Sequence, residues 1–99
     1  MLRSQADVTS EKANRYLIQL CKHFRHKVPA EWREEGPRGT GEVDFPMGRC
    51  EMSAEAGTLT IVCQADSGAA LSTVKRIVED HLVRFGHREN LSVDWSDAP

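Results

Sequence analysis

The sequence lacks any long apolar run. The first twelve residues contain neither the apolar stretch nor the small-residue cleavage site of a secretory signal. No segment reaches the roughly 18 to 20 apolar residues that a helix needs to cross a bilayer. We therefore expect a cytoplasmic protein with no membrane partner.

An excess of charge of one sign is also missing. The 13 Lys and Arg residues are balanced by 15 Asp and Glu residues, which gives a formal net charge of −2. This balance excludes attraction of the whole chain to nucleic acid. Aromatic residues make up only 6% of the chain, too few for an evident base-stacking surface. We expect no nucleic-acid partner, and any basic site must be local.

Cysteine motifs are absent as well. Cys21, Cys50 and Cys63 lie far apart, form no C-x-x-C pair and are odd in number. This pattern favours reduced, buried thiols over a disulfide framework or a zinc site. No spacing suggests a Ser/His/Asp triad, paired carboxylates or an activated thiol, so no catalytic residue is predicted. We favour a non-enzymatic protein, and no cofactor is indicated.

What the sequence does contain is the pattern of one small domain. A chain of 99 residues, of which 39% are hydrophobic, can form a single modest core. Apolar residues recur at steps of three and four over residues 9–27, with Thr9 or Ser10 as the N-cap. They do so again over residues 69–85, entered at Asp66 or Ser67 and ended by Gly86. The spacing predicts a helix in each segment.

Between the helical segments the apolar period changes to two. Alternation over residues 43–45, 50–54 and 59–65 predicts three strands, and residues 91–95 predict a fourth. A further short strand at residues 5–8 has weaker support. Residues 28–40 are polar and rich in Gly, Pro and Glu, so we expect a long surface loop there. The fold class is then α+β, with two helices on one face of an antiparallel sheet of four or five strands, in the order (β)αβββαβ.

The strand pattern also predicts a register. If Cys50 and Cys63 both point into the core, they lie opposite each other in a hairpin closed by Ala56 and Gly57. The two thiols would then be unlinked neighbours on the buried face. Three strands between the helices would make the helices parallel, with both C-termini at one end of the domain.

That shared end is the candidate ligand-binding site. Histidines and cations are concentrated near both predicted helix C-termini, and six of them make up the candidate set: His23, His26, Lys27, His81, Arg84 and Arg88. An anionic small molecule could bind there. The competing interpretation is that cations at helix C-termini only complement the helix dipole. Metal binding by the same histidines stays an open alternative: at most two ligands come from the first segment, His81 or His87 would have to complete the site, and a closed site needs about four ligands.

Two segments of the sequence are distinctive: residues 14–27 read NRYLIQLCKHFRHK, and residues 81–95 read HLVRFGHRENLSVDW. With these segments, the chain resembles a bacterial family of unknown function, the domain of unknown function 2218 family. The resemblance extends from about Ala6 to Trp95. It implies a small α+β domain with no assigned activity, found alone or joined to siderophore-interacting flavoproteins. The six candidate residues and Glu89 match the family in these segments.

Two functions therefore remain open. In the first, the protein is an accessory domain in siderophore or iron handling that binds an anion such as a ferric chelate at the His- and Arg-rich end. In the second, it is an interaction or dimerisation module whose sheet edge meets another protein. The partner in that case would be a second copy of the chain or a siderophore-interacting flavoprotein.

Overall fold

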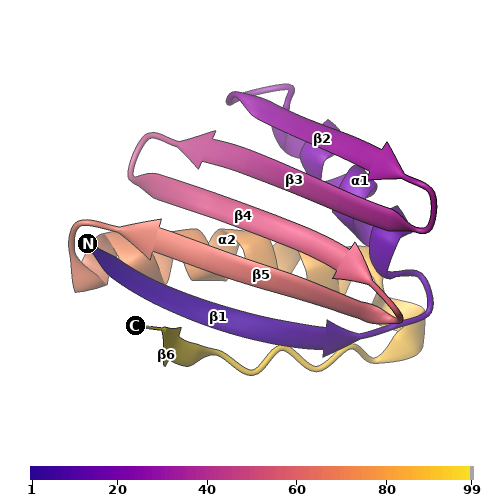
Figure 1. The fold of residues 1–99 in the computed structure, drawn as a ribbon. Helices are drawn as coiled ribbons and strands as arrows, with labels where there is room; N and C mark the ends of the chain where they lie inside the picture. The colour runs from indigo at the N-terminus through magenta and orange to yellow at the C-terminus, as the bar shows by residue number, and fades with distance from the viewer. Residues whose placement is uncertain (99) are drawn as a thin grey trace.

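The fold consists of one sheet with two helices on one of its faces (Figure 1). The computed structural model describes residues 1–98, with side chains through Ser96. Its elements are β1 (Leu2–Thr9), α1 (Ala13–Phe24), β2 (Ala30–Glu35), β3 (Arg38–Phe45), β4 (Gly48–Glu55), β5 (Thr58–Ala65), α2 (Gly68–Phe85), the 3-10 turn η1 (His87–Glu89) and β6 (Ser96–Ala98). The strand order is β2-β3-β4-β5-β1-β6, and every described pair is antiparallel.

This arrangement confirms the α+β class and the placement of both helices on one face. The expected strand at residues 5–8 exists and is longer, as β1. The described residues form six strands rather than four or five. The order β-α-β-β-β-β-α-β contains one strand more between the helices than expected. No helix within the described residues is long and apolar enough to span a bilayer.

The helices form where the apolar stripes predict them, but the ends of α1 differ from the predicted ones. α1 begins at Ala13 rather than Thr9, because β1 continues through Thr9. The Ser10 hydroxyl accepts a hydrogen bond from the Lys12 N–H at 3.0 Å and so still stabilises the start of the helix. α1 ends at Phe24, and residues 25–27 continue as tight turns. The predicted cap of α2 is confirmed, since Ser67 accepts a hydrogen bond from the Ala70 N–H at 3.1 Å.

The register of β4 and β5 is the predicted one. Cys50 lies opposite Cys63, and the strands are joined by a tight turn in which Ala56 and Gly57 both have positive φ, at 50° and 79°. Cys21, Cys50 and Cys63 are all free and fully buried. The predicted pair of unlinked neighbouring thiols is therefore confirmed.

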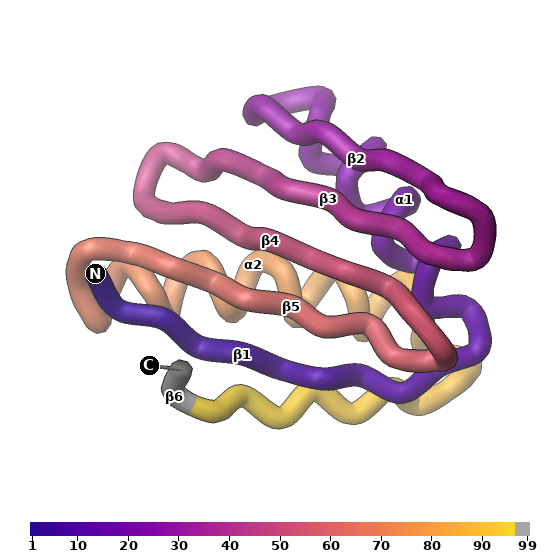
Figure 2. The backbone as a smooth tube through the Cα atoms, viewed as in Figure 1, coloured from indigo at the N-terminus to yellow at the C-terminus, as the bar shows by residue number. Residues whose placement is uncertain are grey.

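The prediction of a long surface loop at residues 28–40 is wrong. This segment holds β2, a tight turn and the start of β3, which form a hairpin beside β4 (Figure 2). The glycines that suggested a loop have two other roles. Gly36, with φ of +62°, makes the turn. A Cβ on Gly39 would lie 1.9 Å from Asn14 Oδ1, so glycine there lets α1 approach β3 closely.

The predicted strand at residues 91–95 is also wrong. Leu91, Val93 and Trp95 pack against the core, but the backbone joins the sheet only at β6, where Ser96 pairs with Gln5 of β1. Trp95 donates a hydrogen bond from Nε1 to Glu79 on α2 at 2.7 Å. The alternation of apolar residues therefore reflects packing of an irregular segment and not a strand.

The helices run in opposite senses, which corrects the predicted parallel arrangement. Tyr16, early in α1, donates a hydrogen bond to Glu89 beyond the end of α2. His23, late in α1, contacts His81, which lies earlier along the chain than Glu89. The expectation rested on three intervening strands, and the additional strand β2 reverses the chain once more. Nevertheless, α1 is short and packs against the last turns of α2, so the expected residues still meet.

Candidate functional site

The centre of the candidate site is a pair of histidines, one from each helix. The ring centroids of His23 and His81 are 4.7 Å apart, with an angle of 46° between the ring planes. His23 is exposed and His81 is half-buried. The helix periodicity explains their positions, because each residue lies at the border between the buried stripe and the solvent-exposed face of its helix.

A local hydrogen bond orients His81. Its Nδ1 lies 2.7 Å from the carbonyl oxygen of Ile77, one turn earlier in α2. Since a carbonyl only accepts, Nδ1 carries the proton and donates it. In the neutral ring, Nε2 is then the unprotonated nitrogen. A ligand at Nε2 would therefore meet an acceptor when His81 is neutral and a donor when it is protonated.

Phenylalanine rings surround the pair. The Phe24 centroid lies 5.0 Å from that of His81, and the Phe85 centroid lies 5.7 Å from that of His23. Phe45 of β3 packs edge-on against Phe24 at 5.1 Å. The sequence assigned these phenylalanines only to the core. The structure shows that they also form a wall of the site, and the i,i+4 spacing of His81 and Phe85 on α2 was the signal for this.

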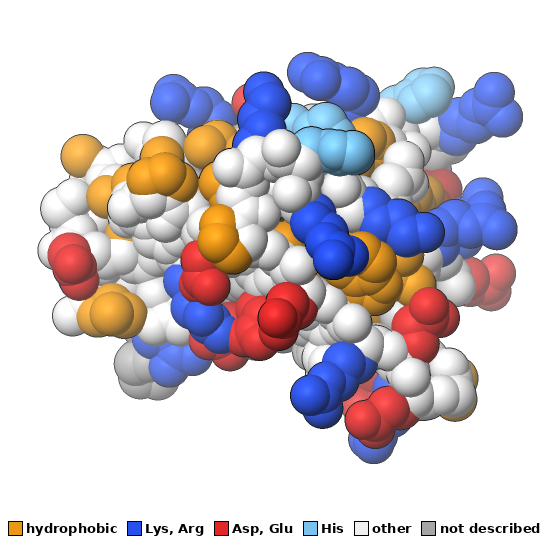
Figure 3. Space-filling view, turned by 90° about the horizontal axis from the view of Figure 1, so that it is seen from above, with side chains coloured by type: hydrophobic (Ala, Val, Ile, Leu, Met, Phe, Trp, Pro, Cys, Tyr) orange, Lys and Arg blue, Asp and Glu red, His pale blue; other side chains and the backbone are white. Residues whose placement is uncertain are grey.

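The electrostatic environment of the pair is positive. Partial burial lowers the pKa of His23 from its ordinary value of 6.5, and the charges of His81, His26, Lys27 and Arg84 lower it further. In the space-filling view, Lys, Arg and His side chains gather along one side of the molecule (Figure 3). The ion pairs of Arg38 and Arg49 lie elsewhere, on the face of the sheet opposite the helices.

The structure thus brings five of the six predicted residues into one neighbourhood. His23 and His81 are in contact, while His26, Lys27 and Arg84 act on His23 through their charges. His26 and Lys27 also line an open hollow of about 460 Å³, which is formed by the segment between the end of α1 and Glu31 of β2. Arg88 does not join them by any described contact. It lies exposed on η1, beyond the end of α2.

Glu89, the neighbour of Arg88, has a structural role. Its carboxylate accepts hydrogen bonds from the hydroxyls of Tyr16 and Ser10. These bonds fasten η1 to the first turn of α1. Glu89 thus connects two segments that are distant in the sequence.

The described residues give limited support for a metal. Two histidines meet, but no group of three His, Cys, Asp or Glu side chains in the described part of the chain could hold an ion. Burial raises the pKa of Cys21 to about 11. A hydrogen bond with Cys63, together with burial, raises the pKa of Cys50.

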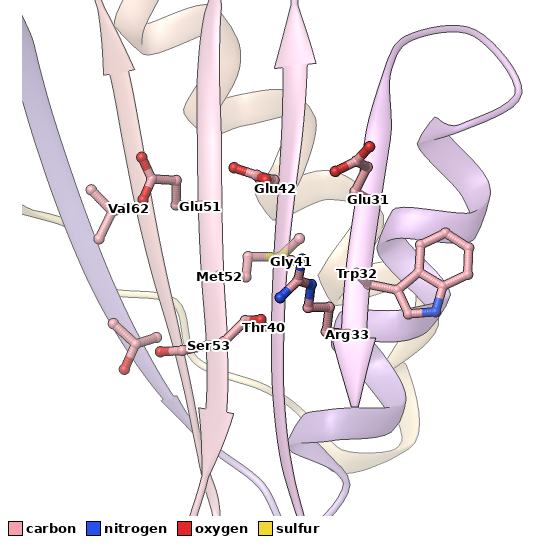
Figure 4. A pocket seen from close by; sticks show the side chains of 11 residues that line it. Glu31, Trp32, Arg33, Thr40, Gly41, Glu42, Glu51, Met52, Ser53 and Val62 are labelled. Carbon is pink, nitrogen blue, oxygen red and sulfur yellow. The ribbon is translucent and has the colours of Figure 1, made fainter. Parts of the chain in front are cut away.

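A second hollow, also of about 460 Å³, lies on the face of the sheet opposite the helices. Figure 4 shows Glu31, Glu42 and Glu51 side by side across β2, β3 and β4. Arg49 pairs with Glu42 and also with Glu51, at 3.3 Å, which neutralises much of this acidic row. The sequence did not predict this surface, because β2 and the start of β3 were assigned to a loop. The alternation of Glu31, Arg33 and Glu35 was the missed signal.

The comparisons with known proteins agree with the fold. The solved structure titled "NMR structure of PA4090 from Pseudomonas aeruginosa" is 32% identical to the chain, with a TM-score of 0.76. The match covers 97% of this chain and 96% of that one. No curated protein matches the chain. A family model described as "Uncharacterized protein conserved in bacteria (DUF2218)" matches residues 5–96. The chain therefore belongs to this family of conserved bacterial proteins.

Proposed function

We propose that this protein is a non-enzymatic domain of the bacterial cytoplasm that binds an anionic small molecule between the C-terminal turns of α1 and α2. The observation that carries the proposal is the contact of His23 with His81 at 4.7 Å, surrounded by other positive groups. The resemblance to domains that occur with siderophore-interacting flavoproteins makes a ferric chelate the first ligand class to test.

The physical basis is the unfavourable charge around His23. His26, Lys27, His81 and Arg84 all disfavour the protonated form of His23. An anion bound among these groups would stabilise the protonated form instead and raise the pKa of His23. Binding is then coupled to proton uptake, so affinity should increase as the pH falls through the histidine range. The adjacent Phe24 and Phe85 rings would shield the anion from water on one side.

The test is a set of melting curves with and without ferric citrate, citrate and inorganic phosphate. The variants are His23→Ala, which truncates an exposed side chain, and His81→Phe, which keeps a ring in contact with Phe24 but removes both nitrogens. A ligand at 100 times its Kd stabilises a protein by about 2.7 kcal/mol, which melting curves resolve easily. We expect both variants to reduce the ligand-induced increase in Tm.

Two substitutions on α2 provide the matched comparison. Arg84→Gln removes a charge that acts on His23, whereas Arg76→Gln removes the same charge from an exposed position of the same helix that does not act on it. We expect only Arg84→Gln to weaken binding. Destabilisation of the histidine variants with no ligand-dependent difference would instead assign the cluster to a structural helix end. Equal effects of the two arginine substitutions would indicate general charge attraction and contradict a defined site.

A further inference from the structure

β2 is an edge strand whose outer side is unpaired by any described strand. Its ladder with β3 shows which backbone groups face outward. The Asp44 N–H donates to the Pro29 carbonyl at 2.9 Å, and Pro29 directly precedes Ala30 in the same register. Because hydrogen-bonded pairs alternate in an antiparallel ladder, residues 31, 33 and 35 also face β3. The N–H and C=O groups of residues 30, 32 and 34 therefore face the free edge.

The two edges of the sheet differ in how they are protected. β6 closes one edge with only three residues, and short edge strands discourage pairing with other chains. β2 has six residues in unbroken register with β3 and contains no proline. Its charged side chains would ordinarily discourage pairing. The order of these charges along the strand, however, makes β2 complementary to a second, antiparallel copy of β2.

Glu31 and Arg33 carry this complementarity. Both point to the open face of the sheet, while Trp32 extends past the outer side of β2 in the view of Figure 4. Neither Glu31 nor Arg33 forms an ion pair among the described side chains. Glu31 lies directly opposite Glu42 in the ladder, where like charges are unfavourable. A positive charge from another molecule at this position would relieve that repulsion.

We propose that β2 pairs antiparallel with β2 of a second copy, about a two-fold axis through Trp32, to form a continuous sheet across a homodimer. In this register Glu31 faces Arg33 of the second copy, and by symmetry Arg33 faces its Glu31. Residues 30, 32 and 34 present their outward groups to residues 34, 32 and 30 of the copy, which allows about six backbone hydrogen bonds. The charged pairs occupy the non-hydrogen-bonded positions, where cross-strand side chains are closest.

The neighbouring registers are less favourable. Pairing about Arg33 would place Arg33 against itself and Glu31 against Glu35, which puts like charges together at every open-face position. Pairing about Glu31 would place two Glu31 side chains against each other. Pairing about Glu34 keeps an Arg33 to Glu35 pair but places Glu34 against itself. Only the register about Trp32 pairs Glu31 with Arg33 and places no like charges opposite each other. It also brings two Trp32 rings together, and Arg25 stacks on each of them at 5.4 Å.

Sedimentation equilibrium of the purified chain, from about 1 μM to about 1 mM, tests the proposal. We expect the wild type to dimerise reversibly, and more weakly at high salt. Glu31→Arg and Arg33→Glu should each be monomeric, because each places like charges opposite each other. An equimolar mixture of the two variants should dimerise again, since every Arg of one then faces a Glu of the other.

A proline substitution provides a test that does not depend on charge. Glu34→Pro removes an N–H that faces the free edge and leaves the ladder to β3 intact, so it should abolish the dimer while circular dichroism shows a folded protein. A wild type that stays monomeric to about 1 mM would overturn the proposal and leave the edge to a strand of a different protein. A dimer that persists in both charge variants, or a mixture that stays monomeric, would overturn the register.

Discussion

Gly41 of β3 faces Cys21 of α1 at a distance that leaves no room for a side chain on the strand. A Cβ atom on Gly41 would lie 2.7 Å from Cys21 Sγ and 3.0 Å from Leu17 Cδ2. Both neighbours are fully buried and belong to the core under α1. The close contact between helix and sheet therefore depends on this glycine, which directly follows the segment that was expected to form a loop.

Gly41→Ala should destabilise the protein by about 1–3 kcal/mol, the usual cost of overpacking a core. Urea unfolding measures the change. Gly68→Ala is the matched control, because no atom lies within 4 Å of a Cβ there, and we expect it to alter stability by about 0.5 kcal/mol or less. The double variant Gly41→Ala/Cys21→Ala should lose less free energy of unfolding than the two single variants lose in sum. Additive costs would show that the contact with Sγ is not the cause.

The protein should lose stability as the pH falls below about 6.5, and His23 should account for part of this loss. The pKa of His23 is lowered in the folded state, by partial burial and then by the nearby positive charges. His23 therefore binds a proton more readily in the unfolded chain than in the folded chain. The contribution of His23 to stability is complete at neutral pH. It is lost as the pH decreases through the pKa of His23 in the unfolded chain toward its lower pKa in the folded chain.

Urea midpoints at about pH 7.5 and pH 5.5 measure this effect, with His23→Gln as the comparison. The variant should lose less stability on acidification than the wild type does. Because His23 is exposed, high salt should reduce the difference between the two proteins. An identical pH dependence in the two proteins would exclude a contribution from His23.

All three thiols should react slowly with a thiol reagent in the native protein. Cys21, Cys50 and Cys63 are fully buried, and burial raises the pKa of Cys21 to about 11, so little thiolate forms at pH values near 8. We expect labelling to be limited by local or global opening of the protein. In urea, the labelling rate should increase to the rate of a free thiol. Fast native labelling of any one cysteine would contradict its burial.

Several features followed from short-range pattern and were therefore predictable. The apolar stripes of α1 and α2 need only the helical period, and the Cys50 to Cys63 register needs only strand parity and a two-residue turn. The pairing of β2 and β3 was missed because polar edge strands show little hydrophobic alternation. Among the candidate residues, the neighbourhood of His23 and His81 was predicted, although the predicted helix direction was wrong and Arg88 did not join it.

By itself, the sequence determined the elements whose residues must bury an apolar face: the two helices, the central strands and the buried thiols. Only the tertiary structure decided which way α1 and α2 run, because that depends on the number of strands between them. It also decided that Gly39 and Gly41 serve helix packing, since a glycine's role depends on what approaches it. The contact between His23 and His81 has the same origin, because two residues 58 positions apart meet only once the sheet has fixed both helices.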